Sequence, residues 1–327
     1  MKQFGRAMFD LYFKDYSEKV WGVDCRQISS EWVAARINGL SLWQAVKNSV
    51  TGMGKKKYKT LTDSFIYPRR GIGRIAERLE EETGKLNPIL TSMELQTVHH
   101  KHDMITSVEV IDNHGRRLTI KGDHFISTIP LTTLVRSFKP LLPIAVRQAA
   151  LQMSYRDLVV VTLMVDKERL TDLTWMYLPG KDMPFGRLHE PKNWSAQMAP
   201  PDKTHVVVEY FCSKDDAIWR MDSQELADHT IQGLEKINLL HKDDVMDSCV
   251  VRVPNAYPVF TTEYQKTLQI ITGSLKRFKN LDLAGRTGAF SYFNMDQAMA
   301  SGLAAAKKVI AAGSADKTEQ VSYAVNY

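Results

Sequence analysis

The chain has 327 residues, of which 24% are charged and 44% are hydrophobic. This length allows two domains or one large one, and the composition is that of an ordinary soluble globular protein. No stretch approaches the roughly 20 apolar residues that span a bilayer, and the chain opens without the apolar run of a signal peptide. The three cysteines, Cys25, Cys212 and Cys249, are far apart and form no Cys-x-x-Cys motif, so we expect a reducing, cytoplasmic location.

The net charge of +6 is modest, and its densest cluster is the run KKKYK at residues 55–59. Such a run occurs in nucleic-acid and anionic-membrane patches, but it is more often a solvated loop, so we expect no nucleic-acid partner. His99, His100 and His102 have no neighbouring cluster of carboxylates or cysteines, so no metal site is expected there.

In chain order, residues 5–50 predict helices, because aromatic residues recur at helical spacing. After a basic loop at 50–62, a glycine-containing turn at 67–73 leads into a helix predicted over 74–83. Two strands over 105–111 and 117–120 enclose a tight hairpin turn, and a further buried strand is predicted over 124–130.

The next segment has a different pattern. Strands of one sheet are predicted over 158–165, 174–178, 206–211 and 248–253, with one amphipathic helix over 223–237. Because this sheet-and-helix unit lies between glycine-rich segments, we interpret it as a domain inserted into another.

Near the C-terminus, a short apolar strand at 281–284 runs into Gly285, and a small-residue helix begins near Asn294. The first amides of a helix have no internal partner and the helix dipole is positive there. The sequence therefore predicts a site for an anion or for the polar edge of a ring.

Three segments in order resemble the flavin-containing amine oxidase superfamily. KDYSEKVWG at residues 14–22 resembles a segment of UDP-galactopyranose mutases and protoporphyrinogen-oxidase-like flavoproteins. YPRRGIG at 67–73 resembles the second glycine segment of the superfamily, and residues 285–306 resemble its C-terminal flavin motif. The resemblance implies an α/β (α+β) fold, with an incomplete Rossmann-like FAD domain interleaved with a mixed-sheet substrate domain.

The same resemblance divides the chain into functional parts. It implies a helical substrate-side segment at 1–60, a partial FAD-binding domain at 61–148 and 262–313, a substrate domain at 149–261, and a disordered tail at 314–327.

The resemblance implies FAD as the cofactor and assigns residues to it. Gly71 and Gly73 would let the backbone approach the flavin ring, which a Cβ would block. The backbone of Leu95 would contact the adenine, and Thr128 and Pro130 would end a strand near the cofactor.

The C-terminal motif supplies the other cofactor residues. Gly285 and Arg286 would meet the pyrophosphate and ribityl region, where a guanidinium suits a phosphate. At the helix start, Asn294, Met295 and Asp296 would approach the O2 edge of the flavin and favour a reduced, anionic ring.

The substrate side is less clearly marked, and no catalytic acid–base pair is evident. A small-molecule substrate is expected. The candidate substrate residues are Tyr16, Trp21, His189, Glu190, Tyr257 and Tyr292, with core packing as the alternative for Tyr16 and Trp21.

The superfamily also carries a Gly-x-Gly-x-x-Gly unit that this sequence does not contain. Three explanations stay open: a truncated form, a partner fragment that supplies the unit, or a remnant that no longer binds FAD. The leading hypothesis is an FAD-dependent oxidoreductase of the amine-oxidase and protoporphyrinogen-oxidase-like group. The alternatives are a nucleotide-sugar mutase resembling UDP-galactopyranose mutase, and a non-catalytic remnant or subunit.

Overall fold

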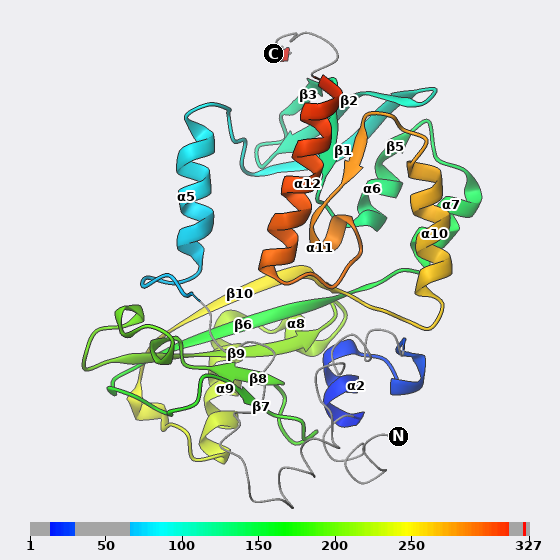
Figure 1. The fold of residues 1–327 in the computed structure, drawn as a ribbon. Coiled ribbons are helices and arrows are strands. Elements are labelled where there is room, and N and C mark those ends of the chain that lie inside the picture. Colours follow the sequence, from blue (N-terminus) through cyan, green and yellow to red (C-terminus); the bar gives the residue numbers. More distant parts are fainter. Residues whose placement is uncertain (1–13, 30–65, 314–322, 325–327) are drawn as a thin grey trace, which may run out of the picture. The chain divides into compact units, whose positions relative to one another are not determined.

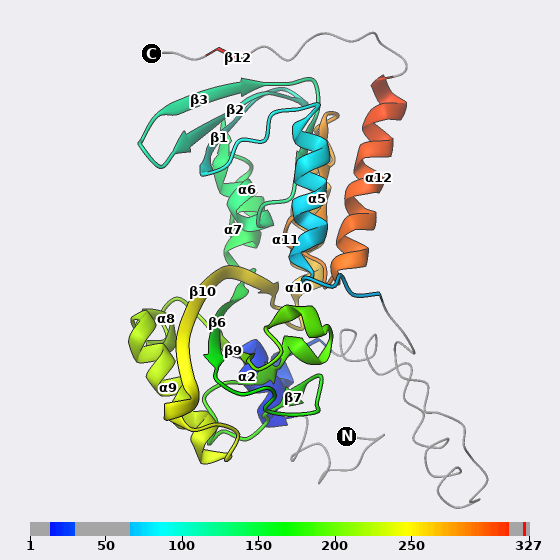
Figure 2. The ribbon, with the colours of Figure 1, turned by 90° about the vertical axis from the view of Figure 1, so that its left-hand side faces the viewer.

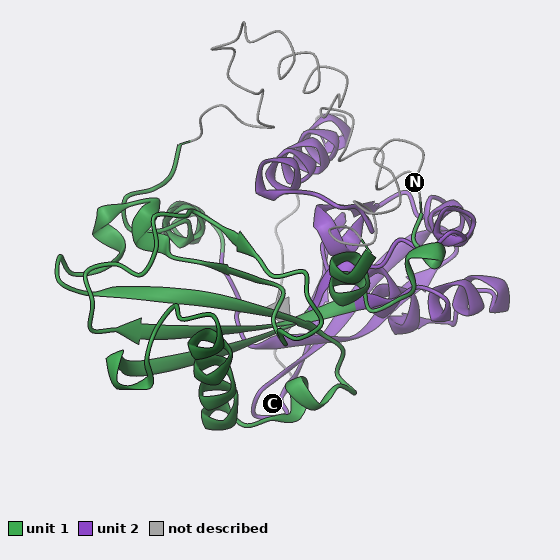
Figure 3. Cartoon of the chain, turned by 90° about the horizontal axis from the view of Figure 1, so that it is seen from below, with its two compact units in different colours: residues 1–87, 156–254 green, residues 88–155, 255–327 purple. Residues whose placement is uncertain are grey.

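The structure, a computed structural model, describes residues 14–29, 66–313 and 323–324 (Figure 1). The chain divides into two compact units, residues 1–87 with 156–254 (unit 1) and residues 88–155 with 255–327 (unit 2) (Figure 3). Most of the helical segment predicted over 5–50, and the basic loop at 50–62, lie outside the described residues. The division into FAD and substrate domains stays a prediction; residues 61–87, which it assigned to the FAD domain, belong to unit 1.

Unit 1 is built on a five-stranded sheet in the order β10-β6-β9-β8-β7. All four segments predicted as strands of one sheet lie in it, which confirms that prediction. The fifth strand, β8, was missed because three residues are too few to show alternation. The strands are β6 (Tyr155–Val165), β7 (Met176–Tyr177), β8 (Arg187–His189), β9 (Thr204–Cys212) and β10 (Val245–Pro258).

One face of this sheet is covered by helix α9 (Ser223–Lys236), close to its predicted range (Figure 2). The helix begins with a capping box between Asp222 and Glu225. Leu226 and Leu234 on the helix share one buried core with alternate residues of β6, β8 and β9. Short helical turns border the sheet: η3 (Pro191–Asn193), η4 (Ala196–Met198), α8 (Ala217–Arg220) and η5 (Lys242–Asp244).

Helix α2 (Asp15–Trp21) is tied to the same sheet through Arg156. The Arg156 guanidinium donates to the carbonyls of Val20 (3.1 Å), Lys19 (3.3 Å) and Phe211 (2.8 Å). The turn η2 (Cys25–Gln27) follows α2. Helix α5 (Gly73–Gly84) begins one residue before its predicted start.

Unit 2 contains a sheet in the order β12-β3-β2-β1-β5. Its antiparallel hairpin, predicted from the sequence, is confirmed: Asp112 accepts hydrogen bonds from the amides of His114 and Arg116 in the turn. The strands are β1 (Met93–Lys101), β2 (Met104–Asp112), β3 (Arg117–Lys121), β5 (Phe138–Lys139) and β12 (Tyr323–Ala324). Within the tail predicted to be disordered, only these last two residues are described.

A second element of unit 2 is the parallel pair β4 (Phe125–Ser127) and β11 (Leu281–Leu283). It leads into α11 (Gly285–Gly288) and the long helix α12 (Met295–Gly313). Three further helices pack together in this unit (Figure 1). They are α6 (Leu131–Ser137), α7 (Ile144–Leu151) and α10 (Tyr264–Leu275). Helices combined with parallel and antiparallel strands confirm the predicted α/β (α+β) class.

Candidate functional site

The carboxyl ends of β4 and β11 bring together two of the segments singled out in the sequence. The amide of Ala284 donates to Ser127 O (3.0 Å), and the hydroxyl of Thr287 donates to Thr128 O (2.9 Å). Thr128 and Gly285 are therefore neighbours, although they are 157 positions apart in the chain. In open α/β sheets, ligands bind just beyond the carboxyl ends of parallel strands.

Two glycines shape this end of the strands. Gly285 adopts a φ of +74°, a conformation that a side chain disfavours. At Gly288 the constraint is steric, because a Cβ there would lie 2.6 Å from Ser127 O and 2.9 Å from the Cα of Thr128. The sequence predicted a glycine turn at Gly285, whereas the constraint on Gly288 depends on a contact between distant segments.

Ser127 also carries an unmatched polar group. Its hydroxyl oxygen is buried and has no hydrogen-bond partner among the described residues. A buried hydroxyl without a partner costs free energy, and such groups in a native fold point to a ligand or a bound water. Together with the close backbone approach at Gly288, it fits a polar group bound beyond the strand ends.

Arg286 lies against two tyrosine rings, Tyr257 and Tyr292, which stack on each other with ring centres 6.0 Å apart. Its guanidinium carbon lies 5.0 Å from the ring centre of Tyr257 and 5.2 Å from that of Tyr292. The same guanidinium donates to Phe293 O (2.7 Å) and Ala256 O (3.4 Å). Within the described part of the chain Arg286 has no ion pair, so its charge is compensated only by carbonyls and ring faces.

The start of α12 is open to solvent. Asn294, Met295 and Asp296 are exposed, and the amide of Asn294 is bound by Gln297 Oε1 (2.9 Å). The helix is anchored further along, where Ser301 accepts a hydrogen bond from Gly285 N (3.2 Å). This contact fixes the helix against the turn that follows β11.

A part-buried polar group fixes the same helix to the strand pair. His124 Nε2 lies 2.7 Å from Asp282, and Lys308 of α12 bonds the same carboxylate. Burial by itself would raise the pKa of Asp282, but Lys308 and His124 together hold it below its usual value.

Two other predicted cofactor residues of unit 2 have different positions. Pro130 directly precedes α6, close to Thr128. Leu95 lies on β1 and pairs with Val110, next to a β-bulge, so it belongs to the other sheet of the unit. β5 pairs with β1 only at Val98 and His99. The backbone of Leu95 therefore lies outside the part of β1 that pairs with β5.

Gly71 and Gly73 belong to unit 1. The amide of Gly71 closes a turn on Pro68 O (2.9 Å), and its φ is +95°. A Cβ at Gly71 would lie 3.1 Å from the side chain of Met198. Ser195 also bonds Arg69 O (2.6 Å), so this turn rests on η4.

The substrate-side candidates of unit 1 are placed in different ways. Tyr16 meets Tyr177 edge-on, with ring centres 5.5 Å apart. Trp21 is only 2% exposed, which is the position of a core residue. His189 lies on β8, stacked on Trp194 at 5.1 Å and 4°.

The face of the unit 1 sheet opposite α9 carries polar residues that the sequence did not reveal. Arg187 and Glu209 lie directly opposite each other in the strand pairing and form an ion pair of 2.5 Å. His189 lies on the same face, two residues from Arg187. Burial, followed by the charge of Arg187, lowers the pKa of His189 to about 4, so its ring is neutral near pH 7.

Glu190 was expected on the substrate side, and the structure corrects this. The residue is fully buried, and its carboxylate accepts hydrogen bonds from Leu170 N, Thr171 N and the hydroxyl of Thr204. It therefore fixes the loop after β6. Alternation explains the difference, because His189 and Glu190 point to opposite sides of the chain.

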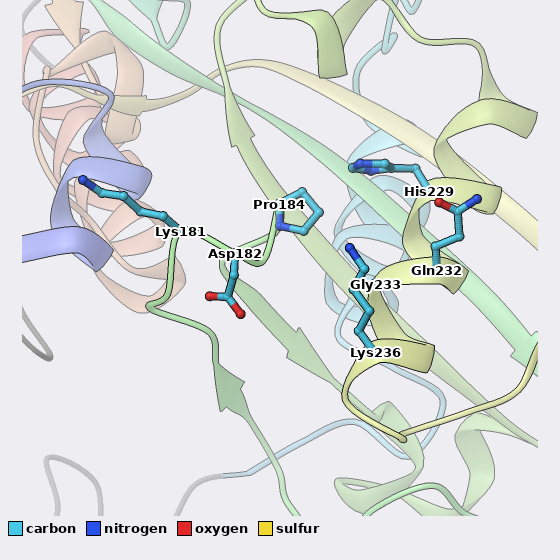
Figure 4. Close-up of a pocket in the computed structure, with 7 residues that line it drawn as sticks. All are labelled: Lys181, Asp182, Pro184, His229, Gln232, Gly233 and Lys236. Carbon is cyan, nitrogen blue, oxygen red and sulfur yellow. The ribbon is translucent and has the colours of Figure 1, made fainter.

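A separate polar pocket of unit 1 lies between α9 and the loop before β8, and encloses about 200 Å³ (Figure 4). Lys181, Asp182, His229 and Lys236 line it. Lys181 pairs with Asp15 (3.3 Å), so its charge is partly satisfied outside the pocket. The pocket contains none of the residues predicted from the sequence.

Two further properties concern the described ranges. They hold no group of three or more His, Cys, Asp or Glu side chains placed to bind a metal ion. None of their helices has both the length and the apolar character needed to cross a bilayer.

Comparison with solved structures shows related folds. A reduced UDP-galactopyranose mutase superposes with a TM-score of 0.78 at 23% identity, over 95% of this chain and 66% of the other. A protein described as a protoporphyrinogen oxidase, from Exiguobacterium sp. 255-15, gives 0.66 at 17%, over 93% and 64%. A putrescine oxidase bound to putrescine gives 0.51 at 15%, over 74% and 53%.

The chain thus spans less than two thirds of the length of these structures. No curated protein sequence matches it. The sequence model of the flavin containing amine oxidoreductases matches residues 8–310, which is most of the chain. The chain therefore belongs to the flavin containing amine oxidoreductase family.

Proposed function

We propose that the protein binds FAD and acts as an FAD-dependent oxidoreductase of the amine-oxidase and protoporphyrinogen-oxidase-like group. When bound, the flavin supplies hydride or electron transfer, and the protein supplies binding and orientation. The observation that carries the proposal is the end of the β4–β11 pair. There a positive-φ glycine, a close backbone approach at Gly288 and the unmatched hydroxyl of Ser127 occur together.

In this proposal, different residues of unit 2 bind different parts of the cofactor. Gly285 and Arg286 bind the phosphate region, because two N–H groups at Nη2 of Arg286 have no partner within the described residues. Met295 and Asp296 offer the unpaired amides of α12 to the flavin ring. Thr128 and Pro130 support the cofactor from the end of β4, and Leu95 supports it from β1.

The turn at Gly71 and Gly73 and the polar sheet face are proposed to serve the flavin ring and the substrate. His189 stays neutral down to acidic pH, so it recognises a small-molecule substrate by hydrogen bonding rather than by charge. Tyr16 of unit 1 is also proposed as a substrate residue, and so, separately, are Tyr257 and Tyr292 of unit 2. Trp21 is not, because its ring is buried in the core.

The second candidate function is a nucleotide-sugar mutase that uses reduced flavin without net oxidation. The observation that favours it is Arg286 beside the rings of Tyr257 and Tyr292, since a guanidinium with no carboxylate partner among the described residues suits a diphosphate. Incubation with a UDP-hexopyranose and dithionite separates the two. A chromatographically distinct isomer supports the mutase, whereas flavin reduction by an amine or a porphyrinogen supports the oxidoreductase.

A partner segment with a Gly-x-Gly-x-x-Gly unit is also proposed. The solved relatives are about half as long again as the part matched here. In the described part of unit 2, β4 and β11 form a sheet of only two parallel strands. Parallel sheets normally have both faces covered, so this pair favours packing by a further segment. Along α12, the apolar side chains of Met299 and Leu303 are exposed and offer an apolar surface on which such a segment could pack.

The test is FAD binding by the purified chain, alone and coexpressed with a βαβ segment that contains Gly-x-Gly-x-x-Gly. Visible flavin absorbance after gel filtration, and a rise in melting temperature with FAD, would support the proposal in either arm. Absence of flavin in both arms would refute it and favour the non-catalytic remnant. Flavin in the coexpressed arm alone would support the partner segment.

A further inference from the structure

Tyr155 links the two loops that follow β4 and β11. It is the first residue of β6, and its hydroxyl accepts a hydrogen bond from Leu131 N (3.0 Å). The same hydroxyl donates to Thr287 O (3.1 Å). Leu131 follows the loop at 128–130, and Thr287 lies in α11, so one phenol joins both sides of the candidate cofactor site.

The need for this hydroxyl follows from the start of α6. Pro130 occupies the N-cap position and has no side-chain oxygen, so it cannot bind the first amides of the helix. The phenol of Tyr155 takes that role from 24 residues away. Burial raises its pKa to about 12, so it keeps the proton that it donates to Thr287 O.

The ring of Tyr155 is itself held in place. Phe290, two residues after the end of α11, meets it edge-on with ring centres 5.2 Å apart. Phe290 is fully buried and has a positive φ of +47°. Ring and hydroxyl thus contact the same loop from two directions, while Thr287 makes a second tie to Thr128 O.

We propose that Tyr155 is a positioning residue for the cofactor: its hydroxyl sets the spacing between the loop at 128–130 and α11. This inference rests on the proposed function, because it assumes that these two loops hold FAD. Removal of the hydroxyl leaves the Leu131 amide and the Thr287 carbonyl without their partner, and the loops lose their fixed separation.

The experiment compares wild type, Tyr155→Phe and Thr287→Val in the form of the protein that binds FAD. Tyr155→Phe keeps the ring and removes only the hydroxyl, and Thr287→Val removes the second tie between the loops. We expect each variant to weaken FAD binding by roughly 3- to 10-fold. We also expect the visible circular dichroism of the bound flavin to change, because its orientation depends on the two loops.

The matched control is Tyr264→Phe, on α10 of the same unit. Its hydroxyl makes no hydrogen bond with the described residues, so FAD affinity and flavin spectrum should stay at wild-type values. If Tyr155→Phe lowers the melting temperature of the apoprotein but leaves both flavin readouts unchanged, Tyr155 is only structural and the inference is wrong. If Tyr155→Phe does not fold, unchanged flavin readouts in Thr287→Val overturn it. Absence of FAD binding by wild type refutes the proposed function instead.

Discussion

The imidazole of His189 lies parallel to the indole ring of Trp194, with an angle of 4° and ring centres 5.1 Å apart. The Nδ1 atom of His189 is buried without a hydrogen-bond partner in the described part of the chain. Glu209 lies 3.9 Å from that atom, but its carboxylate is bound to Arg187 and does not offset the cost of burial. The ring is therefore fixed in its neutral form.

This arrangement predicts a pH dependence of stability. The pKa of His189 is about 4 in the fold and near its ordinary 6.5 when unfolded, so the unfolded chain binds the proton more tightly. Stability from this group is complete above pH 6.5 and falls as the pH drops toward 4, by up to roughly 3 kcal/mol. Urea unfolding across this range measures it. His189→Phe should remove this part of the slope, while His114→Gln in the exposed hairpin turn should retain it; an unchanged slope in His189→Phe would contradict the account.

The close approach of Gly288 to Ser127 predicts a steric effect. Gly288→Ala places a Cβ against backbone atoms that cannot move independently, and it should destabilise the protein by about 1–3 kcal/mol. Gly302→Ala is the control, because no atom lies within 4 Å of its added Cβ and it lies inside α12. It should stabilise by up to about 1 kcal/mol. Equal unfolding free energies for the two variants would show that the strand ends are not packed as described.

The corrected role of Glu190 also has a measurable consequence. Glu190→Ala leaves three buried or half-buried donors without their acceptor and should cost about 2–4 kcal/mol of unfolding free energy. Glu190→Gln keeps one acceptor oxygen and should cost less. Because none of these contacts involves a residue proposed to bind the cofactor, FAD affinity should not change. If Glu190→Ala had normal stability but lost turnover, Glu190 would instead be a substrate-side residue.

Arg286 is predicted to depend on its planar guanidinium. Arg286→Lys keeps the charge but loses the paired contacts to Phe293 O and Ala256 O and the stacking on both tyrosines. FAD should bind about 10-fold or more weakly to this variant, as measured by fluorescence titration. Arg277→Lys, whose guanidinium lies over Phe278 elsewhere in unit 2, is the control that should bind as wild type. If Arg286→Lys bound FAD with the same affinity as wild type, Arg286 would not be a cofactor-binding residue.

The sequence predicted the elements whose signal is local. The sheet of unit 1, the hairpin at Asp112, α5 and α9 follow from alternation, turn residues and helical spacing. Helices α6, α7 and α10 were missed, because the first two begin just after prolines in short apolar segments and α10 has a mixed surface. Gly285 could be recognised from its motif, whereas Gly288, Ser127 and Tyr155 gain their roles only from contacts between distant segments.

The central claim is that the carboxyl ends of β4 and β11 bind FAD. Its most direct test is an FAD titration of wild type and Gly288→Val, each with and without the coexpressed Gly-x-Gly-x-x-Gly segment, read by quenching of flavin fluorescence. The account predicts saturable binding by wild type in at least one arm, and binding reduced by about 10-fold or more in Gly288→Val, whose side chain would push against the backbone of Ser127 and Thr128 at the strand end. Saturable binding that is equal in both proteins, or no binding by wild type in either arm, would contradict it.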